Sequence, residues 1–114
     1  MFCPNQIICI ELDDLRLFAE VIQMIPDRDR LWARALALAK QKNFNLHLLH
    51  DLREAPQLIL PPSLFREALD TEVMPLMTEL FQLEALAKPE PNTEVLGRQA
   101  LHAFVRNLLQ PTAS

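Results

Sequence analysis

The stretch PQLILPPSLFREALD, residues 56–70, divides the chain into two parts with different apolar patterns. Before Pro61, short apolar runs rich in Ile and Val are interrupted about every ten residues by charged or proline-containing clusters, a pattern typical of strands joined by turns. After Pro62, leucines recur at intervals of three and four residues, which is typical of amphipathic helices. We therefore predict one α+β domain over residues 1–114, with a β-rich part at 6–61 and a helical part at 63–110.

The β-rich part is predicted to form a small antiparallel sheet or an SH3-like barrel. Residues 6–12 are a short β-branched segment between Pro4-Asn5 and Asp13-Asp14, which favours a strand. Residues 46–52 and 57–60 flank a short loop, the arrangement expected of two strands that pair with each other. These segments indicate a sheet built from neighbouring antiparallel strands.

The middle of the β-rich part fits both a strand and a helix. Leu15–Ile25 has a good apolar stripe on either template, so periodicity does not decide between them. Leu31–Ala39 alternates strictly, with Trp32, Leu36 and Leu38 on one side and small alanines on the other, which favours a strand. Its Ala and Leu content nevertheless favours a helix by intrinsic propensity. An all-α fold is therefore the alternative.

The glycine content also bears on the fold. The chain has one glycine, whereas two-residue hairpins usually need positive φ angles. We therefore expect the turns at Asp13-Asp14 and at 27–29 to be longer or of type I. This is the main objection to the β-rich interpretation.

Two leucine stripes are expected in the helical part. Asp70 is expected to cap the first of these helices, and Asn92 or Thr93 is expected to cap the last. The residues expected to face the core are Val73, Leu76, Leu80 and Leu83, widened by Met77 and Phe81, and then Leu101, Phe104, Val105 and Leu108. Gly97 would allow the last helix to pack closely. Leucines on the flanks exceed what one stripe buries, which predicts self-association or a partner surface; they are Leu86, Leu96 and Leu109.

Charge and cysteine usage exclude several classes of protein. The net charge of −4 and a pI near 5.3 argue against a dedicated nucleic-acid binder, which needs a basic face. No apolar run approaches the roughly 18 residues of a membrane span, and no basic region precedes the first apolar run, so we expect no secretory signal. Cys3 and Cys9 fit neither a zinc pair nor a CxxC motif and are too far apart along a strand for a disulfide. We predict free thiols and a cytoplasmic location.

Three motifs resemble a family of small, uncharacterised cyanobacterial proteins. They are LWARALAL at 31–38, DLR at 51–53 and LFREALDTEVMP at 64–75, and the similarity extends from about residue 7 to residue 80. Such proteins often have proline where this chain has Ala35, which disfavours a helix there, so the resemblance favours strands. It implies a cytoplasmic or thylakoid-peripheral location and supplies no activity or functional residues.

Catalytic and metal-binding signatures are weak. A single glycine excludes P-loop and Rossmann fingerprints, and no serine lies in a nucleophile-elbow context. The string His47, His50 and Asp51 is the nearest approach to a metal site. On a strand its odd spacing would send the imidazoles to opposite faces, and His102 is distant. We predict no enzyme, no cofactor and no metal site.

The best binding candidates are Arg30, Trp32 and Arg34. On a strand these three share one face, and Trp and Arg are the residues most enriched at interface hot spots. We predict a non-catalytic interaction, assembly or regulatory factor with a protein partner or a second copy of itself. A photosynthetic or other membrane-associated complex is what the resemblance implies as its setting. The alternatives are a nucleic-acid-binding small barrel and, third, a small metal-dependent enzyme.

Overall fold

The computed structural model describes residues 2–43, 45–86 and 93–109. It is an antiparallel sheet of six strands followed by two helices, which confirms the α+β class and makes the all-α alternative wrong. The strands are β1 (Ile7–Leu12), β2 (Leu15–Ile25), β3 (Arg30–Lys42), β4 (Asn45–Asp51), β5 (Leu58–Leu60) and β6 (Arg66–Glu67). The helices are α1 (Asp70–Leu86) and α2 (Thr93–Leu109), and short 3-10 turns lie at Pro26–Arg28 and Pro62–Leu64.

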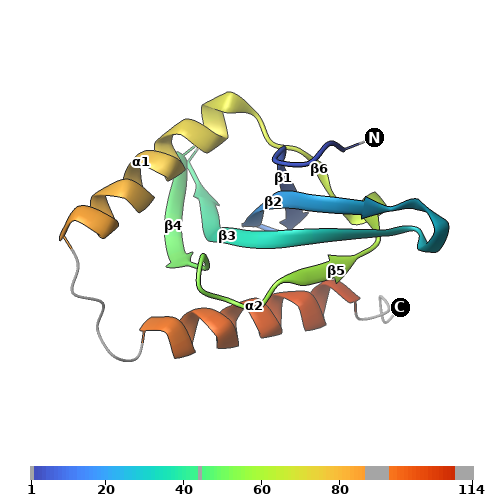
Figure 1. Cartoon of the computed structure of the whole chain (residues 1–114). Helices are drawn as coiled ribbons and strands as arrows, with labels where there is room; N and C mark the ends of the chain where they lie inside the picture. The colour runs from blue at the N-terminus through green and yellow to red at the C-terminus, as the bar shows by residue number, and fades with distance from the viewer. Residues whose placement is uncertain (1, 44, 87–92, 110–114) are drawn as a thin grey trace.

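The sheet runs in the order β4-β3-β2-β1-β6, and β5 pairs separately with β3 (Figure 1). The predicted pairing of residues 46–52 with 57–60 is wrong. β4 pairs with residues 37–42 of β3, whereas β5 pairs with residues 31–33 of the same strand. β3 is 13 residues long, so its edge accommodates both short strands one after the other. The path of paired strands is open in the described residues, and closure into an SH3-like barrel stays a prediction.

The tight turns use Asp and Asn in place of glycine. Leu12 pairs with Leu15, so only Asp13 and Asp14 connect β1 to β2, and the expectation of a longer or type I turn there is wrong. Asp13 has φ 53°, and Asn43, between β3 and β4, has φ 51°. Short polar side chains tolerate this left-handed region because they hydrogen-bond locally. One glycine is therefore no obstacle to this sheet.

A β-bulge at Leu36 divides β3 into two halves. Ala35 is opposite Ala19 and Ala37 is opposite Phe18, so Leu36 is the extra residue. The bulge reverses the alternation of side chains. The prediction that Trp32, Leu36 and Leu38 share a side is therefore wrong, because Leu38 packs in the same core as the alanines that precede the bulge.

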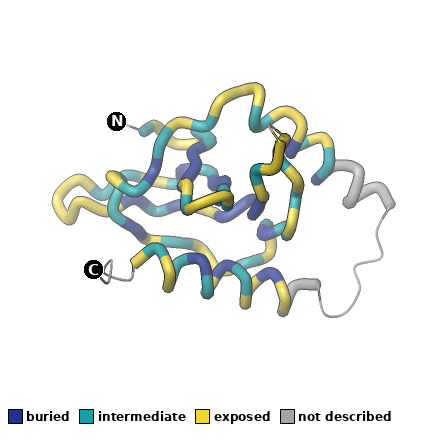
Figure 2. Tube along the Cα trace, turned by 180° about the vertical axis from the view of Figure 1, so that it is seen from behind, coloured by how far each residue is buried: buried dark blue, intermediate teal, exposed yellow. Residues whose placement is uncertain are grey.

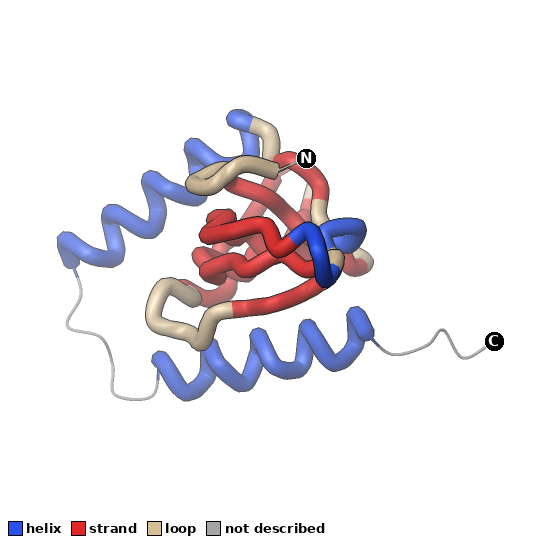
Figure 3. Tube along the Cα trace, turned by 45° about the vertical axis from the view of Figure 1, so that its right-hand side comes forward, coloured by secondary structure: helices blue, strands red, loops and turns tan. Residues whose placement is uncertain are grey.

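The two helices lie on opposite sides of the strands (Figures 1 and 3). α2 covers the main core, whose buried residues are Ile8, Ile10, Leu17, Ala19, Val21, Leu31, Ala33, Ala35, Leu38, Leu52, Leu60, Phe65, Leu101 and Phe104. α1 covers a second cluster, in which Leu76 packs with Cys9, Phe18 and Ala39. Figure 2 shows that the buried positions follow the strands, whereas the tip of the β2–β3 hairpin is exposed.

The helical part matches its expected stripes wherever the structure describes them. Leu76 and Leu80 of α1 and Leu101 and Phe104 of α2 are buried. The side chains of Phe81, Leu83 and Leu86 and the expected cap at Asn92 lie outside the described residues. The helical part was predicted to begin at residue 63, but its first helix begins at Asp70, because residues 62–67 form a 3-10 turn and β6. A Cβ at Gly97 would lie 3.4 Å from the Asp51 carbonyl oxygen and from Leu52 Cδ2, so this glycine packs α2 closely against the end of β4.

Candidate functional site

The three predicted binding residues occupy one exposed end of the sheet. Arg30, Trp32 and Arg34 alternate with buried residues along β3, and β3 has no extra residue between them. Trp32 is opposite Gln23 on β2 and opposite Ile59 on β5. We call the surface formed by Arg30, Trp32 and Arg34 with Glu20, Gln23 and Ile59 the Trp32 face.

The side chains of the Trp32 face are held by specific contacts. Trp32 Nε1 donates a hydrogen bond to Gln57 Oε1 at 2.8 Å. Arg34 Nη2 lies 3.2 Å from Glu20 Oε1, in an ion pair between directly opposite residues. Such contacts reduce the side-chain freedom that a bound partner would otherwise have to remove.

Arg30 differs from Arg34 in its electrostatic environment. Its Nη1 donates to the Asp29 carbonyl oxygen at 3.0 Å, and the described part of the chain contains no carboxylate in an ion pair with it. Asp29 itself has φ 49° and donates its N–H to the Pro26 carbonyl oxygen, which ends the 3-10 turn and begins β3. Arg30 is therefore an exposed guanidinium available to an acceptor from outside the chain.

The Trp32 face carries apolar surface that the fold does not cover. Ile59 is 59% exposed, and Trp32 is partly exposed although both of its neighbours along β3 are buried. α1 covers the other half of β3, where Leu36 and Ala37 line a cavity of only about 10 Å³ against Leu76 and Leu80. The β2–β3 hairpin projects beyond both helices (Figure 1). A partly exposed tryptophan beside an exposed isoleucine suits recognition better than catalysis.

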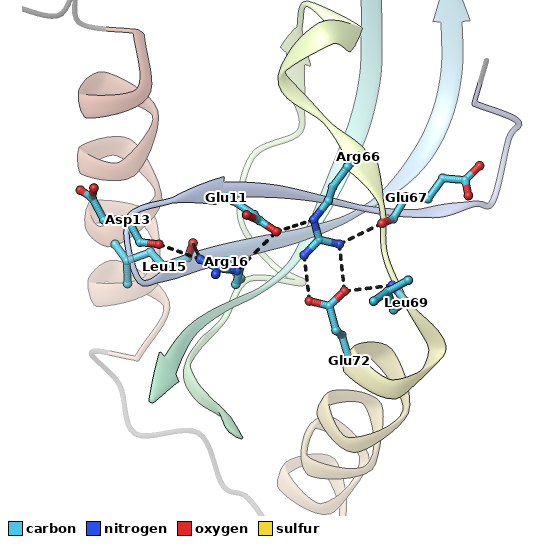
Figure 4. A network of polar contacts seen from close by, with 8 residues as sticks. All are labelled: Glu11, Asp13, Leu15, Arg16, Arg66, Glu67, Leu69 and Glu72. Atoms are coloured by element: carbon cyan, nitrogen blue, oxygen red, sulfur yellow. Dashed lines mark hydrogen bonds and ion pairs between the residues drawn. The ribbon is translucent and has the colours of Figure 1, made fainter. Parts of the chain in front are cut away.

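A second polar network joins β6 and α1 to the sheet (Figure 4). Arg66 donates to both oxygens of Glu72, at 2.9 and 2.8 Å, and its Nε donates to Glu11 at 2.5 Å. Arg16 lies 3.8 Å from the same Glu11 oxygen. Hydrogen bonds to Glu72 and then to Glu11 raise the pKa of Arg66, outweighing its partial burial. The hydrogen bond from Arg66 also lowers the pKa of Glu72, against the opposing effect of burial.

The network fixes the start of α1. Glu72 Oε1 also accepts the Leu69 N–H at 3.0 Å, three residues back, which is the reciprocal half of a capping box. The cap is therefore Glu72 acting on Leu69 rather than the Asp70 side chain. This network explains why α1 lies where it does.

Asp51 and Arg53 form a similar anchor at the end of β4. Arg53 donates to both Asp51 oxygens, at 2.9 and 2.6 Å, and reaches the Leu80 carbonyl oxygen of α1 at 3.4 Å. Burial tends to raise the pKa of Asp51, but the hydrogen bonds and charge of Arg53 outweigh it and the pKa is lowered. The DLR motif is therefore a structural link between β4 and α1.

Both cysteines are free thiols, as predicted. Cys3 is exposed, whereas Cys9 is buried in the second cluster beside Phe18. Burial raises the pKa of the Cys9 thiol to about 12. A thiol in this state is a poor nucleophile, because the thiolate is the reactive form.

The histidines of β4 lie differently from the prediction. Leu49 is an extra residue on β4, because His50 is opposite Leu38 and Leu48 is opposite Ala39. This bulge brings His47 and His50 to the same face of the sheet, so the expectation of opposite faces is wrong. Across residues 2–43, 45–86 and 93–109, no group of three or more His, Cys, Asp and Glu is placed to hold a metal ion.

Other exposed apolar side chains are scattered over the helices. Leu96 is 54% exposed, Leu109 53% and Met74 69%, on α2 and α1. The predicted apolar flanks therefore exist at Leu96 and Leu109, but they lie more than three turns apart along α2. Among the described residues, Lys42, Asn43, Asn45 and His47 line an open hollow of about 470 Å³ beside the β3–β4 turn. Neither feature gathers aromatic and cationic groups as the Trp32 face does.

The sequence did not reveal three residues that contribute to this site. Ile59 and Gln57 come beside Trp32 because β5 pairs with β3, which the predicted 46–52/57–60 hairpin would have prevented. Glu20 comes beside Arg34 through the separate pairing of β2 with β3. The length of the alternating run in β3 could have indicated the pairing with β5, because a strand this long has an edge that extends beyond β4 and can pair with another strand. Neither described helix is long and apolar enough to cross a membrane.

Comparisons with known proteins give little further information. No protein-family model matches the chain, and no curated protein matches it. Among solved structures, the crystal structure of kinase-associated protein B from Bacillus cereus is similar, with a TM-score of 0.42 and 16% sequence identity. The alignment covers 93% of this chain and 99% of that chain. Our functional proposal therefore rests on the residues of the Trp32 face.

Proposed function

We propose that this chain is a non-catalytic interaction factor that binds a protein partner through the Trp32 face. The supporting observation is the Trp32–Ile59 pair, which lies between two arginines on the side of β3 opposite the main core. Tryptophan and arginine are the residues that contribute most often to interface hot spots. The buried thiol and the histidine pair offer no comparable arrangement for catalysis.

The resemblance to small cyanobacterial proteins adds a setting to this proposal. It would place the interaction in the assembly or regulation of a photosynthetic or other membrane-associated complex. No residue of the Trp32 face depends on that setting, so the binding proposal can be tested independently of it.

The test is capture of partners on the tagged chain from the native cell, followed by titration of the recovered protein. Trp32→Ala should weaken binding by about 2 kcal/mol or more, roughly thirtyfold, because it removes the central aromatic group. Arg34→Ala should also weaken binding. Leu96→Ser is the control, because it removes an exposed apolar residue away from the face.

Equal affinity of the wild-type chain and both face variants would refute the proposal. Recovery of RNA or DNA, with binding that falls steeply as salt is raised, would instead support the nucleic-acid alternative. Far-UV circular dichroism of each variant checks that the fold is retained.

A further inference from the structure

We propose that the Trp32 face binds a second copy of this chain, face to face, in a twofold-symmetric dimer. This deepens the proposed function, because it names the partner of the same surface. Sheets that pack face to face lie about 10 Å apart, with their strands within about 30° of each other. The uncovered end of the sheet presents Trp32 and the 59% exposed Ile59 for such packing.

The first argument is the charge balance at this end of the molecule. Three arginines and three carboxylates lie on the face and the adjoining hairpin tip, so their formal charges cancel: Glu20, Asp27, Arg28, Asp29, Arg30 and Arg34. A surface without net charge does not favour a strongly acidic or strongly basic ligand. It is compatible with a copy of itself, which presents the same balanced set of charges.

The second argument is the order of charges along β3. Arg30 precedes Trp32 by two residues, and Arg34 follows it by two, so the two arginines are about 13 Å apart along the strand. A twofold axis that passes near Trp32, parallel to the plane of the sheet and perpendicular to β3, reverses the strand direction in the second copy. The Arg30 end of one copy then lies over the end of the other copy that carries Arg34 and Glu20.

Glu20 has the capacity to accept this second arginine. Its Oε1 accepts a hydrogen bond from Arg34 at 3.2 Å, and no contact to Oε2 exists within the described residues. A carboxylate has about four acceptor positions, so Glu20 can bridge its own Arg34 and the Arg30 of the second copy. The symmetry forms this contact twice, and Trp32 and Ile59 supply the apolar centre between the two contacts.

The test is sedimentation velocity of the purified full chain between about 1 µM and 1 mM, a range that covers weak dimers. The mass should rise from that of the 13.1 kDa monomer towards twice that value. Arg30→Glu and Glu20→Arg should each weaken dimerisation at least tenfold. An equimolar mixture of these two variants should dimerise again, because both intermolecular contacts are then between opposite charges.

Arg98→Glu is the matched control, because Arg98 is exposed on α2, away from both the Trp32 face and the hairpin tip. It should leave the dimer constant within about twofold. A monomeric mass at the highest concentration, or equal effects of Arg98→Glu and Arg30→Glu, would overturn the inference. If the chain is monomeric but Trp32→Ala still abolishes capture of another protein, this inference fails and the proposed function stands. If self-association occurs but capture is insensitive to Trp32, the proposed function fails.

Discussion

Replacement of Glu72 by glutamine tests the polar network that attaches α1 to the sheet. Glu72 accepts two hydrogen bonds from Arg66 and one from the Leu69 N–H. Glutamine keeps the shape and can still accept the Leu69 bond, but it has no charge. Hydrogen bonds to charged groups contribute about 1.5–3 kcal/mol each. The Arg66 side chain is 35% exposed and would still be paired with Glu11 in this variant. We therefore expect the free energy of unfolding to fall by about 1.5 kcal/mol, the low end of this range.

The same variant should show a distinctive dependence on pH. The pKa of Glu72 is lowered in the folded chain, chiefly by the hydrogen bond from Arg66. The corresponding stability is fully present above the unfolded pKa of about 4.3 and is lost as the pH falls through the lower folded pKa. The difference between the wild type and Glu72→Gln should therefore be constant at neutral pH and decrease below about pH 4.3.

Urea denaturation at a series of pH values measures this difference. Glu67→Gln is the matched control. Glu67 is exposed, follows Arg66 on β6, and accepts a hydrogen bond from Arg66 only through its backbone carbonyl oxygen. The control should change the free energy of unfolding by less than about 0.5 kcal/mol. The reasoning is wrong if Glu72→Gln is as stable as this control at pH 7, or if its deficit persists unchanged in acid.

Three further predictions concern other parts of the fold. Gly97→Ala should be neutral or should raise the free energy of unfolding by up to about 1 kcal/mol, because alanine favours the helix and its Cβ would lie 3.4 Å from its nearest neighbours. Gly97→Leu should lower the melting temperature, because the larger side chain has no space beside Leu52. Asp13→Ala should cost about 1 kcal/mol in urea denaturation, because Asp13 has φ 53°, whereas Asp13→Gly should be tolerated. In a thiol titration with an aromatic disulfide at pH 8, Cys3 should react at once and Cys9 only on unfolding. The reason is that burial raises the pKa of Cys9 to about 12, whereas Cys3 is exposed. Two thiols that react fast in the folded chain would contradict the buried position of Cys9.

The change of apolar pattern at Pro61-Pro62 was enough to favour the α+β class, although residues 15–39 fitted both a strand and a helix. The alternation around Trp32 is also enough to place Arg30 and Arg34 with it on one face of a strand. The switch at Leu36 was not predictable in the same way, because a bulge is set by pairing with β2 rather than by the residues of β3 alone. For the same reason the sequence did not predict the separate pairing of β5 with β3, which brings Ile59 beside Trp32.

The bulge at Leu36 also connects the fold to the proposed function. Without it, a strand of 13 residues would present one uninterrupted face to each helix. With it, Ala33, Ala35 and Leu38 contribute to the main core, while Leu36 and Ala37 line the cavity under α1. α1 begins beside β6, where the Arg66 network fixes it, and covers only the half of β3 that follows the bulge. In the half of β3 that precedes the bulge, one side packs in the main core and the other side carries Trp32 and Arg34. The exposure of the Trp32 face is thus a consequence of where α1 is attached. Because Arg66 and Glu72, which make the attachment, are not part of the face, Glu72→Gln should lower the stability of the chain more than its affinity for the partner.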